Sequence, residues 1–145
     1  MKRLILTTTF AVAAVSLGGC ATQSAARQHA ATLGGPASRG VEFPGTPGPG
    51  EPREHRVLVD EPALKLASIV LRGGTVLPTH HSEMPVTIIA LQGSGTVVAG
   101  SQRMRLDPTH AVVLAPGTPH SVEPDTGTDL VLLVHHLGRG EEHHP

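Results

Sequence analysis

Leu114-Ala-Pro-Gly-Thr-Pro-His120 is the stretch that decides the fold, and Gly74-Thr-Val-Leu-Pro-Thr-His80 is its counterpart earlier in the chain. Both place a His after a short segment that contains Gly and Pro, which favour turns and interrupt regular structure. Around them, runs rich in Val, Ile and Leu alternate with clusters of Gly, Pro, Asp and Thr about every 8–12 residues. This spacing predicts an all-β sandwich or barrel.

The segment between His55 and Gly138 carries about eight short strands and almost no helix by this pattern. Alternation along an extended chain places every second side chain on the same face. It therefore predicts that Ser82, Val86, Ile88 and Ala90 point inward and line a pocket for a small organic molecule. The expected strands cover residues 56–60, 63–71, 85–92, 95–99, 102–106, 111–114, 121–123 and 130–136.

The two quoted stretches resemble the paired motifs of the small single-domain, RmlC-like cupins, a family of small double-stranded antiparallel β-barrels of the jelly-roll kind. Gly74, His80 and Gly93 fall on the spacing of the first family motif. Gly117 and His120 fall on the spacing of the second. The resemblance covers essentially all of residues 56–137 and implies the same barrel here.

The resemblance also implies a divalent metal (Fe, Mn, Ni or Zn) held by His80 and His120. The family's second His position is Ser82 here and its Glu position is Val86, so half of the expected ligands are missing. Open catalytic metal sites usually take about three protein ligands, and a hydroxyl is a poor substitute for imidazole. The motif is therefore degenerate, and the metal is expected to be weak or absent.

Two neighbouring side chains are candidates for a third ligand. Strand parity points His81 and Glu83 away from the face that His80 occupies. A bulge before Pro85 would turn one of them inward. Without such a bulge, His80 and His120 would bond to each other, to water or to a ligand with no metal.

The first 19 residues have the layout of a bacterial export signal: Lys2 and Arg3, then an apolar run, then small residues. The run covers residues 4–17 and is shorter than the roughly 20 residues of a membrane-spanning helix. Cys20, the only cysteine, resembles the lipidated first residue of bacterial lipoproteins. Ala21 follows it, which favours an outer-membrane anchor facing the periplasm. The alternative is cleavage without lipidation.

The chain thus divides into four expected segments. These are a signal peptide over residues 1–19, a lipidated and disordered tether over 20–54, the barrel over 55–138 and a polar tail over 139–145. Between Gly34 and Pro52, Gly and Pro occupy 11 of 19 positions, a composition that cannot build a core. The domain is small enough that a homodimer, formed through an apolar sheet face, is also expected.

Composition limits the partners. Aromatic residues are 1% of the chain and basic residues do not cluster, which excludes base-stacking and phosphate-tracking nucleic-acid modules. Removal of residues 1–19 takes away Lys2 and Arg3 and leaves 9 basic residues against 12 acidic ones. This mildly acidic balance gives no electrostatic reason to expect anionic partners. Contact with the membrane is expected through the lipid alone.

Three functions remain open. The first is a lipid-anchored periplasmic protein that binds a small organic molecule in its barrel. The second is a metal-dependent enzyme, of oxygenase or isomerase type, that uses His80 and His120. The third is a His-rich metal-buffering protein in which pairs such as His143-His144 matter more than the barrel. The sequence leaves open whether the protein is an enzyme.

Replacing Cys20 with Ala is expected to move the protein from the membrane fraction to the soluble periplasmic fraction, because it removes the site of lipid attachment. Fractionation and intact-mass measurement check this. A wild-type mass equal to that of the unmodified chain from residue 20 onward would contradict lipidation.

Overall fold

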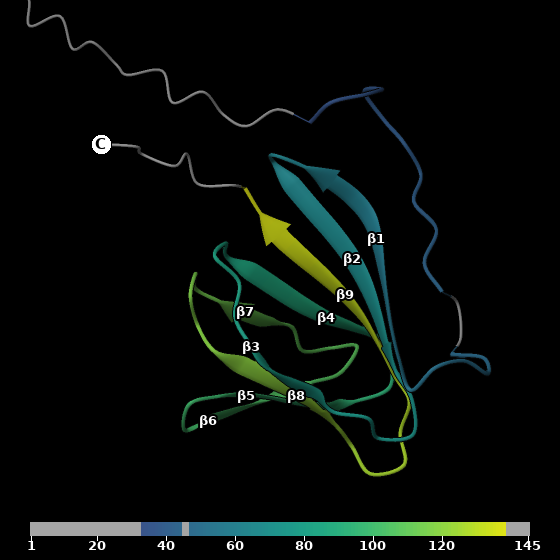
Figure 1. The fold of residues 1–145 in the computed structure, drawn as a ribbon, viewed down its shortest axis with the longest axis vertical. Helices are drawn as coiled ribbons and strands as arrows, with labels where there is room; N and C mark the ends of the chain where they lie inside the picture. The colour runs from purple at the N-terminus through teal and green to yellow at the C-terminus, as the bar shows by residue number, and fades with distance from the viewer. Residues whose placement is uncertain (1–32, 45–46, 139–145) are drawn as a thin grey trace, which may run out of the picture.

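The computed structural model describes residues 33–44 and 47–138, and within these residues it contains strands and no helix (Figure 1). The prediction of an all-β fold is confirmed. None of the described residues forms a helix with the length and apolar character that a membrane crossing requires. The strands are β1 (Arg53–Glu61), β2 (Leu64–Leu71), β3 (Leu77–His80), β4 (Val86–Gln92), β5 (Gly95–Ala99), β6 (Gln102–Leu106), β7 (Val112–Leu114), β8 (His120–Pro124) and β9 (Leu130–Leu137).

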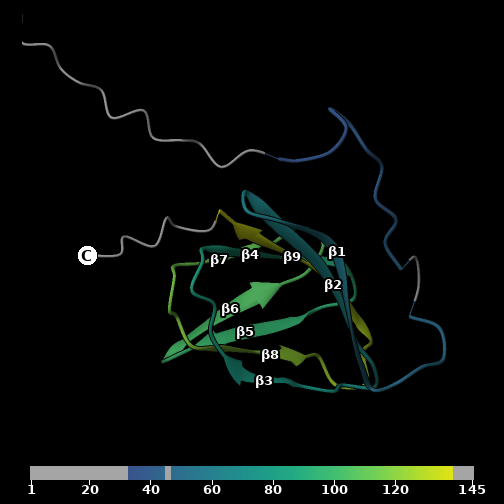
Figure 2. The same ribbon diagram turned by 45° about the horizontal axis from the view of Figure 1, so that its top comes forward.

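The strands form two antiparallel sheets that lie as layers, as Figure 2 shows. One sheet has five strands in the order β1-β2-β9-β4-β7, and the other has four in the order β3-β8-β5-β6. All eight expected strands are present, with ends that differ by a few residues. The sequence analysis missed β3, which contains Pro78. Because proline cannot donate a ladder hydrogen bond, it belongs on an edge strand, and β3 is an edge strand.

The space between the two sheets is filled by aliphatic side chains. Leu71, Ile88, Leu106, Leu130 and Leu132 are among the largest side chains that are fully buried. Each contributes roughly 1.5–3 kcal/mol through its removal from water. This composition is the one expected for a chain with no Trp or Tyr and only two Phe.

Strand β9 lies at the centre of the larger sheet and is covered on both faces. Leu130, Leu132 and Val134 point into the main core. On the other face, Leu133 packs with Val59 and Leu66 in a second, smaller cluster. A strand that is buried on both sides reads as a continuous apolar run, and residues 130–134 are all buried.

The second cluster is partly covered by the segment that precedes β1. Val41 packs against it, and Arg39 forms an ion pair with Glu61 at the end of β1. Closer to β1, Arg72 donates hydrogen bonds to the carbonyl oxygens of Gly48 at 2.7 Å and Glu51 at 2.5 Å. The described part of the predicted tether over residues 20–54 thus contacts the domain. Polar side chains that face this segment hold it on the domain, although its composition resists regular structure.

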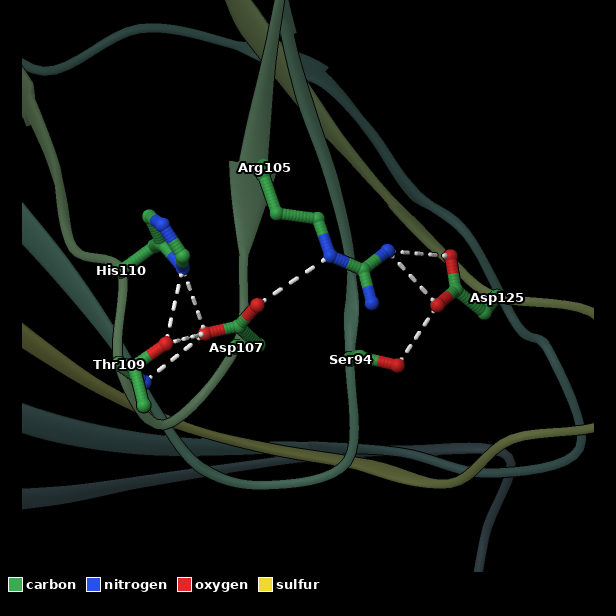
Figure 3. Close-up of polar contacts among 6 residues, drawn as sticks. All are labelled: Ser94, Arg105, Asp107, Thr109, His110 and Asp125. Atoms are coloured by element: carbon green, nitrogen blue, oxygen red, sulfur yellow. Dashed lines mark hydrogen bonds and ion pairs between the residues drawn. The ribbon is translucent and has the colours of Figure 1, made fainter.

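A network of polar side chains joins the β4–β5, β6–β7 and β8–β9 turns, at the end of the smaller sheet remote from His80 and His120 (Figure 3). Arg105 stands in its middle, with Nη1 2.9 Å from Oδ2 of Asp125 and Nε 3.3 Å from Oδ2 of Asp107. The Ser94 hydroxyl donates to the Asp125 carboxylate at 2.6 Å.

The Asp107 carboxylate receives further bonds on its other oxygen. The ring Nδ1 of His110 lies 2.9 Å from Oδ1, and the Thr109 hydroxyl donates to the same atom at 2.7 Å. These hydrogen bonds hold the pKa of Asp107 well below its usual range. Asp107 therefore stays charged and keeps the turn between β6 and β7 closed.

Gly93 forms the turn between β4 and β5 with a φ of 80°, and a Cβ added to it would lie 2.1 Å from the carbonyl oxygen of Asp129. Gly100, in the turn between β5 and β6, has a φ of 59° and no atom within 4 Å of such a Cβ. Gly93 therefore meets both a conformational and a steric requirement, and Gly100 meets only the first.

Gly93→Ala is accordingly expected to lower the free energy of unfolding by roughly 2–5 kcal/mol, through left-handed strain plus overpacking. Gly100→Ala, the matched control, is expected to cost about 1–2 kcal/mol because it carries the strain alone. Urea unfolding followed by far-ultraviolet circular dichroism measures both. Equal losses would contradict the close approach of the two turns.

Candidate functional site

His80 and His120 lie side by side at one end of the smaller sheet. They are direct partners in the antiparallel pairing of β3 with β8. Their ring centroids are 4.3 Å apart and the ring planes are tilted by 53°. The two His predicted as candidate metal ligands are therefore together in the structure, although forty residues of chain separate them.

Each ring is oriented by its own backbone. Nδ1 of His80 lies 2.8 Å from the carbonyl oxygen of Pro78, and Nδ1 of His120 lies 2.9 Å from that of Thr118. A carbonyl oxygen only accepts hydrogen bonds, so Nδ1 carries the proton in both rings. The neutral rings then present a lone pair at Nε2. This is the tautomer that a metal or a hydrogen-bond donor of a ligand would use.

The two His differ in exposure. His80 lies at the surface, whereas His120 is 3% exposed. Burial lowers the pKa of His120, and the charge on neighbouring His80 acts in the same direction. His120 is therefore held in its neutral form to a lower pH than an ordinary His.

His136 is a third His of this region, and the sequence analysis did not select it. Its Nδ1 lies 3.2 Å from the Ser82 hydroxyl, which also accepts the backbone N–H of Met84 at 3.1 Å. This hydrogen bond orients the His136 ring against the loop that carries Ser82. Parity could have found this residue, because His136 follows the inward-pointing Leu132 and Val134 at a spacing of two.

The backbone joins the two motif loops. The N–H of Gly117 donates to the carbonyl oxygen of Ser82 at 2.7 Å. Gly117 has a φ of 71°, which an L-residue rarely adopts, so the glycine allows the turn that makes this bond. The bond holds Ser82 beside the strand that carries His120.

The other candidate residues lie elsewhere. His81 Nε2 is 2.9 Å from Oε1 of Glu83, and these side chains are 56% and 86% exposed. No bulge turns either of them inward beside His80. Both instead form an exposed pair on the loop between β3 and β4.

The predicted pocket lining is corrected in part. Val86, Ile88 and Ala90 do point inward, as parity predicted, but they belong to the packed main core. Aliphatic side chains from the facing sheet fill the space in front of them, so they line no opening at the site described below. Of that prediction, Ser82 alone reaches the His cluster, through His136. Cys20 and His143-His144 lie outside the described residues.

The described residues do not fit the metal that the sequence resemblance implied. No group of three or more His, Cys, Asp or Glu among them is arranged to hold a metal ion. Ser82 is bonded to His136, and Val86, at the carboxylate position, is part of the core. Two imidazole nitrogens are fewer than the three protein ligands that an open catalytic site usually has.

A pocket of about 340 Å³ opens beside His80 and His136. It lies between the β1–β2 edge of the larger sheet and the edge strand β3 of the smaller one. Its position follows from the register, because His136 pairs with Lys65 of β2 and His80 ends β3. The lining residues are Arg53, His55, Lys65, Ile69, Leu77, His80 and His136.

The chain matches no family model, and no curated protein matches it in sequence. Solved structures resemble it closely in fold. An RmlC-like cupin from Methanocaldococcus jannaschii with a double-stranded β-helix fold has a TM-score of 0.61 at 19% identity, over 72% of this chain and 94% of that one. A cupin superfamily protein from Desulfitobacterium hafniense has a TM-score of 0.58 at 12% identity, over 65% and 84%. The cupin domain of Schizosaccharomyces pombe Cnp3 has a TM-score of 0.56 at 14% identity, over 70% of each chain.

At these identities the likeness shows the fold, and it confirms the barrel that the two motifs predicted. The described part of the chain has the fold of these cupin structures. Function has to be argued from the site, because one fold serves many functions.

The lowered pKa values of His120 and His136 predict that the protein loses stability on acidification. Burial lowers the pKa of both His120 and His136 below the ordinary value of 6.5. The unfolded chain therefore takes up these protons at a higher pH than the folded chain does. The stabilising contribution is complete above pH 6.5 and is lost as the pH falls through the folded-state pKa values.

The free energy of unfolding, measured by urea titration at a series of pH values from 8 to 5, is expected to fall below about pH 6.5. His136→Gln should reduce the slope because it removes one of the two protons. Circular dichroism is the suitable signal, since the chain has no Trp or Tyr. An unchanged slope in this variant would contradict the assignment.

Proposed function

We propose that this cupin-domain protein is exported, anchored by lipid at Cys20, and holds a small organic molecule in the pocket between the β1–β2 edge and β3. The proposal rests chiefly on one observation, the pocket of about 340 Å³ beside His80 and His136. Small-molecule sites are concave, have volumes of roughly 300–1,000 Å³, and combine apolar walls with a few polar groups. This pocket fits that description at its small end.

Apolar and polar lining residues would make different contacts with a ligand. Ile69 and Leu77 supply apolar surface, and both touch the main core, which fixes their positions. His80 and His136 supply ring nitrogens, and a hydrogen bond at Nδ1 orients each ring. A ligand that enters the pocket therefore meets polar groups that are already oriented, which reduces the entropy lost on binding.

Binding in this pocket does not require a metal. His80 and His136, which line it, are oriented by hydrogen bonds to the Pro78 carbonyl and to Ser82. The proposed role is therefore to bind, carry or sense a small molecule. We assign no catalytic step.

The sequence of the N-terminal segment supports the proposed location outside the cytoplasm. Residues 1–19 have the layout of an export signal, and Cys20 follows them as the lipidated residue does in lipoproteins. A small barrel held at that surface would meet solutes that enter the cell envelope.

A metal-dependent enzyme is the second candidate, and one observation favours it. His80 and His120 are paired across two strands, and each is bonded at Nδ1 to a backbone carbonyl. That bond orients and polarises metal-bound His in other proteins. A third ligand would have to come from outside the described set.

Protein purified from the membrane fraction, without an affinity tag, is expected to carry a small molecule that native mass spectrometry detects. Leu77→Trp should abolish this mass because the indole fills the pocket. Val76→Trp, at the neighbouring exposed position outside the lining, should retain it. A bound mass of equal occupancy in both variants would rule out this pocket.

Elemental analysis of the same sample separates the two candidate functions. We expect no stoichiometric Fe, Mn, Ni or Zn. A near-stoichiometric metal that is lost in the His80→Ala/His120→Ala double variant would instead favour the enzyme.

A further inference from the structure

The charges of the pocket all have one sign. Its ionisable lining residues are Arg53, Lys65 and three His, and among the described residues no carboxylate lines it. This is unexpected in a domain whose acidic residues outnumber its basic ones once residues 1–19 are removed. The positive charge is therefore concentrated at the pocket and does not reflect the chain as a whole.

Four of the described arginines outside the pocket form ion pairs with carboxylates. Arg39 pairs with Glu61, Arg72 with Glu54, Arg103 with Glu123, and Arg105 with Asp107 and Asp125. The structure thus uses ion pairs at four arginines, whereas the cations of the pocket are placed around an opening.

Two facts describe the surroundings of Lys65. Its partner in the β1–β2 register is Asp60, a carboxylate that lies outside the pocket lining. Its partner in the β2–β9 register is His136. Burial lowers the pKa of His136, and the nearby charges of Lys65 and His55 act in the same direction.

We propose that the pocket between β1–β2 and β3 binds a small organic anion, a carboxylate with an apolar body. This inference rests on the proposed function and names the class of its ligand. Arg53 and Lys65 line the pocket from points six residues apart, measured along β2, and would together attract the carboxylate, because cationic nitrogens form the strongest hydrogen bonds that a carboxylate accepts. Ile69 and Leu77 would contact the apolar part.

The size of the pocket and the apolar part of its wall favour a small organic carboxylate over larger anions and over bare inorganic ones. A pocket of about 340 Å³ holds a small molecule, and part of its wall is apolar, which a bare inorganic anion would leave unused. Lys65 is only partly exposed, so its charge is less screened by solvent than that of a lysine on an open surface. An anion would also relieve the mutual repulsion of the lining cations.

The test compares acids with their neutral amides on the full-length mature protein. Benzoate, pyruvate and succinate are titrated by isothermal calorimetry and by ¹H–¹⁵N NMR against benzamide, pyruvamide and succinamide. At least one acid is expected to bind, at least about tenfold more tightly than its amide, and to shift the amide signals of the lining residues. Lys65→Met and Arg53→Met should each weaken that acid by at least about fivefold.

The matched control is Arg56→Met. Arg56 lies on the same strand as Arg53 and carries the same charge, but it does not line the pocket. Its removal should leave the affinity for the acid within about twofold, because a distant surface charge is screened by salt. Should Lys65→Met fail to fold, Arg53→Met still decides the matter, since Arg53 is exposed at the start of an edge strand.

Several results would overturn the inference. Equal binding of an acid and its amide, unaffected by Lys65→Met, would reject the anion and leave the small-molecule pocket in place. Equal weakening by Arg56→Met would show that overall charge alone is at work. Binding of no acid at millimolar concentration would also reject it. Failure of the proposed function would show separately, as the absence of any co-purified mass that Leu77→Trp removes.

Discussion

The antiparallel pairing of β9 with β2 on one side and β4 on the other is the constraint on which the rest of the structure depends. Residues 130–134 are buried on both faces, so a shift of one residue would move Leu132 and Val134 out of the main core. The same register sets Lys65, His136 and Val86 in one row across the larger sheet. Packing of apolar side chains therefore fixes where the polar groups of the site stand.

The second sheet supplies the other half of the site by the same means. His80 and His120 meet because β3 pairs with β8, and the bond from Gly117 to the Ser82 carbonyl holds the two loops together. The Ser82 hydroxyl bonds to His136 and orients its ring. A loop of the smaller sheet's edge thus helps to place a His that lines the pocket.

Charge is distributed differently in the Arg105 network and in the pocket. In the network, Arg105 joins Asp107 and Asp125 so that each charge has an opposite neighbour (Figure 3). In the pocket, Arg53 and Lys65 face an opening lined by His and aliphatic residues. The first arrangement ties turns together, whereas the second leaves cations placed where a ligand can reach them. Net charge, a sum over the whole chain, conceals this difference.

The sequence by itself determined the fold. Its turn residues and alternating apolar runs located eight of the nine strands, and its two motifs predicted both the barrel and the approach of His80 to His120. Strand positions follow from local backbone geometry, and the two motifs are recognised from the spacing of their Gly, Pro and His residues along the chain. The tertiary structure decided the place of the pocket, the part played by His136, and the grouping of Arg53 with Lys65. Such contacts depend on strand register and on how two sheets close, because residues distant in the chain become neighbours only when the whole core has packed.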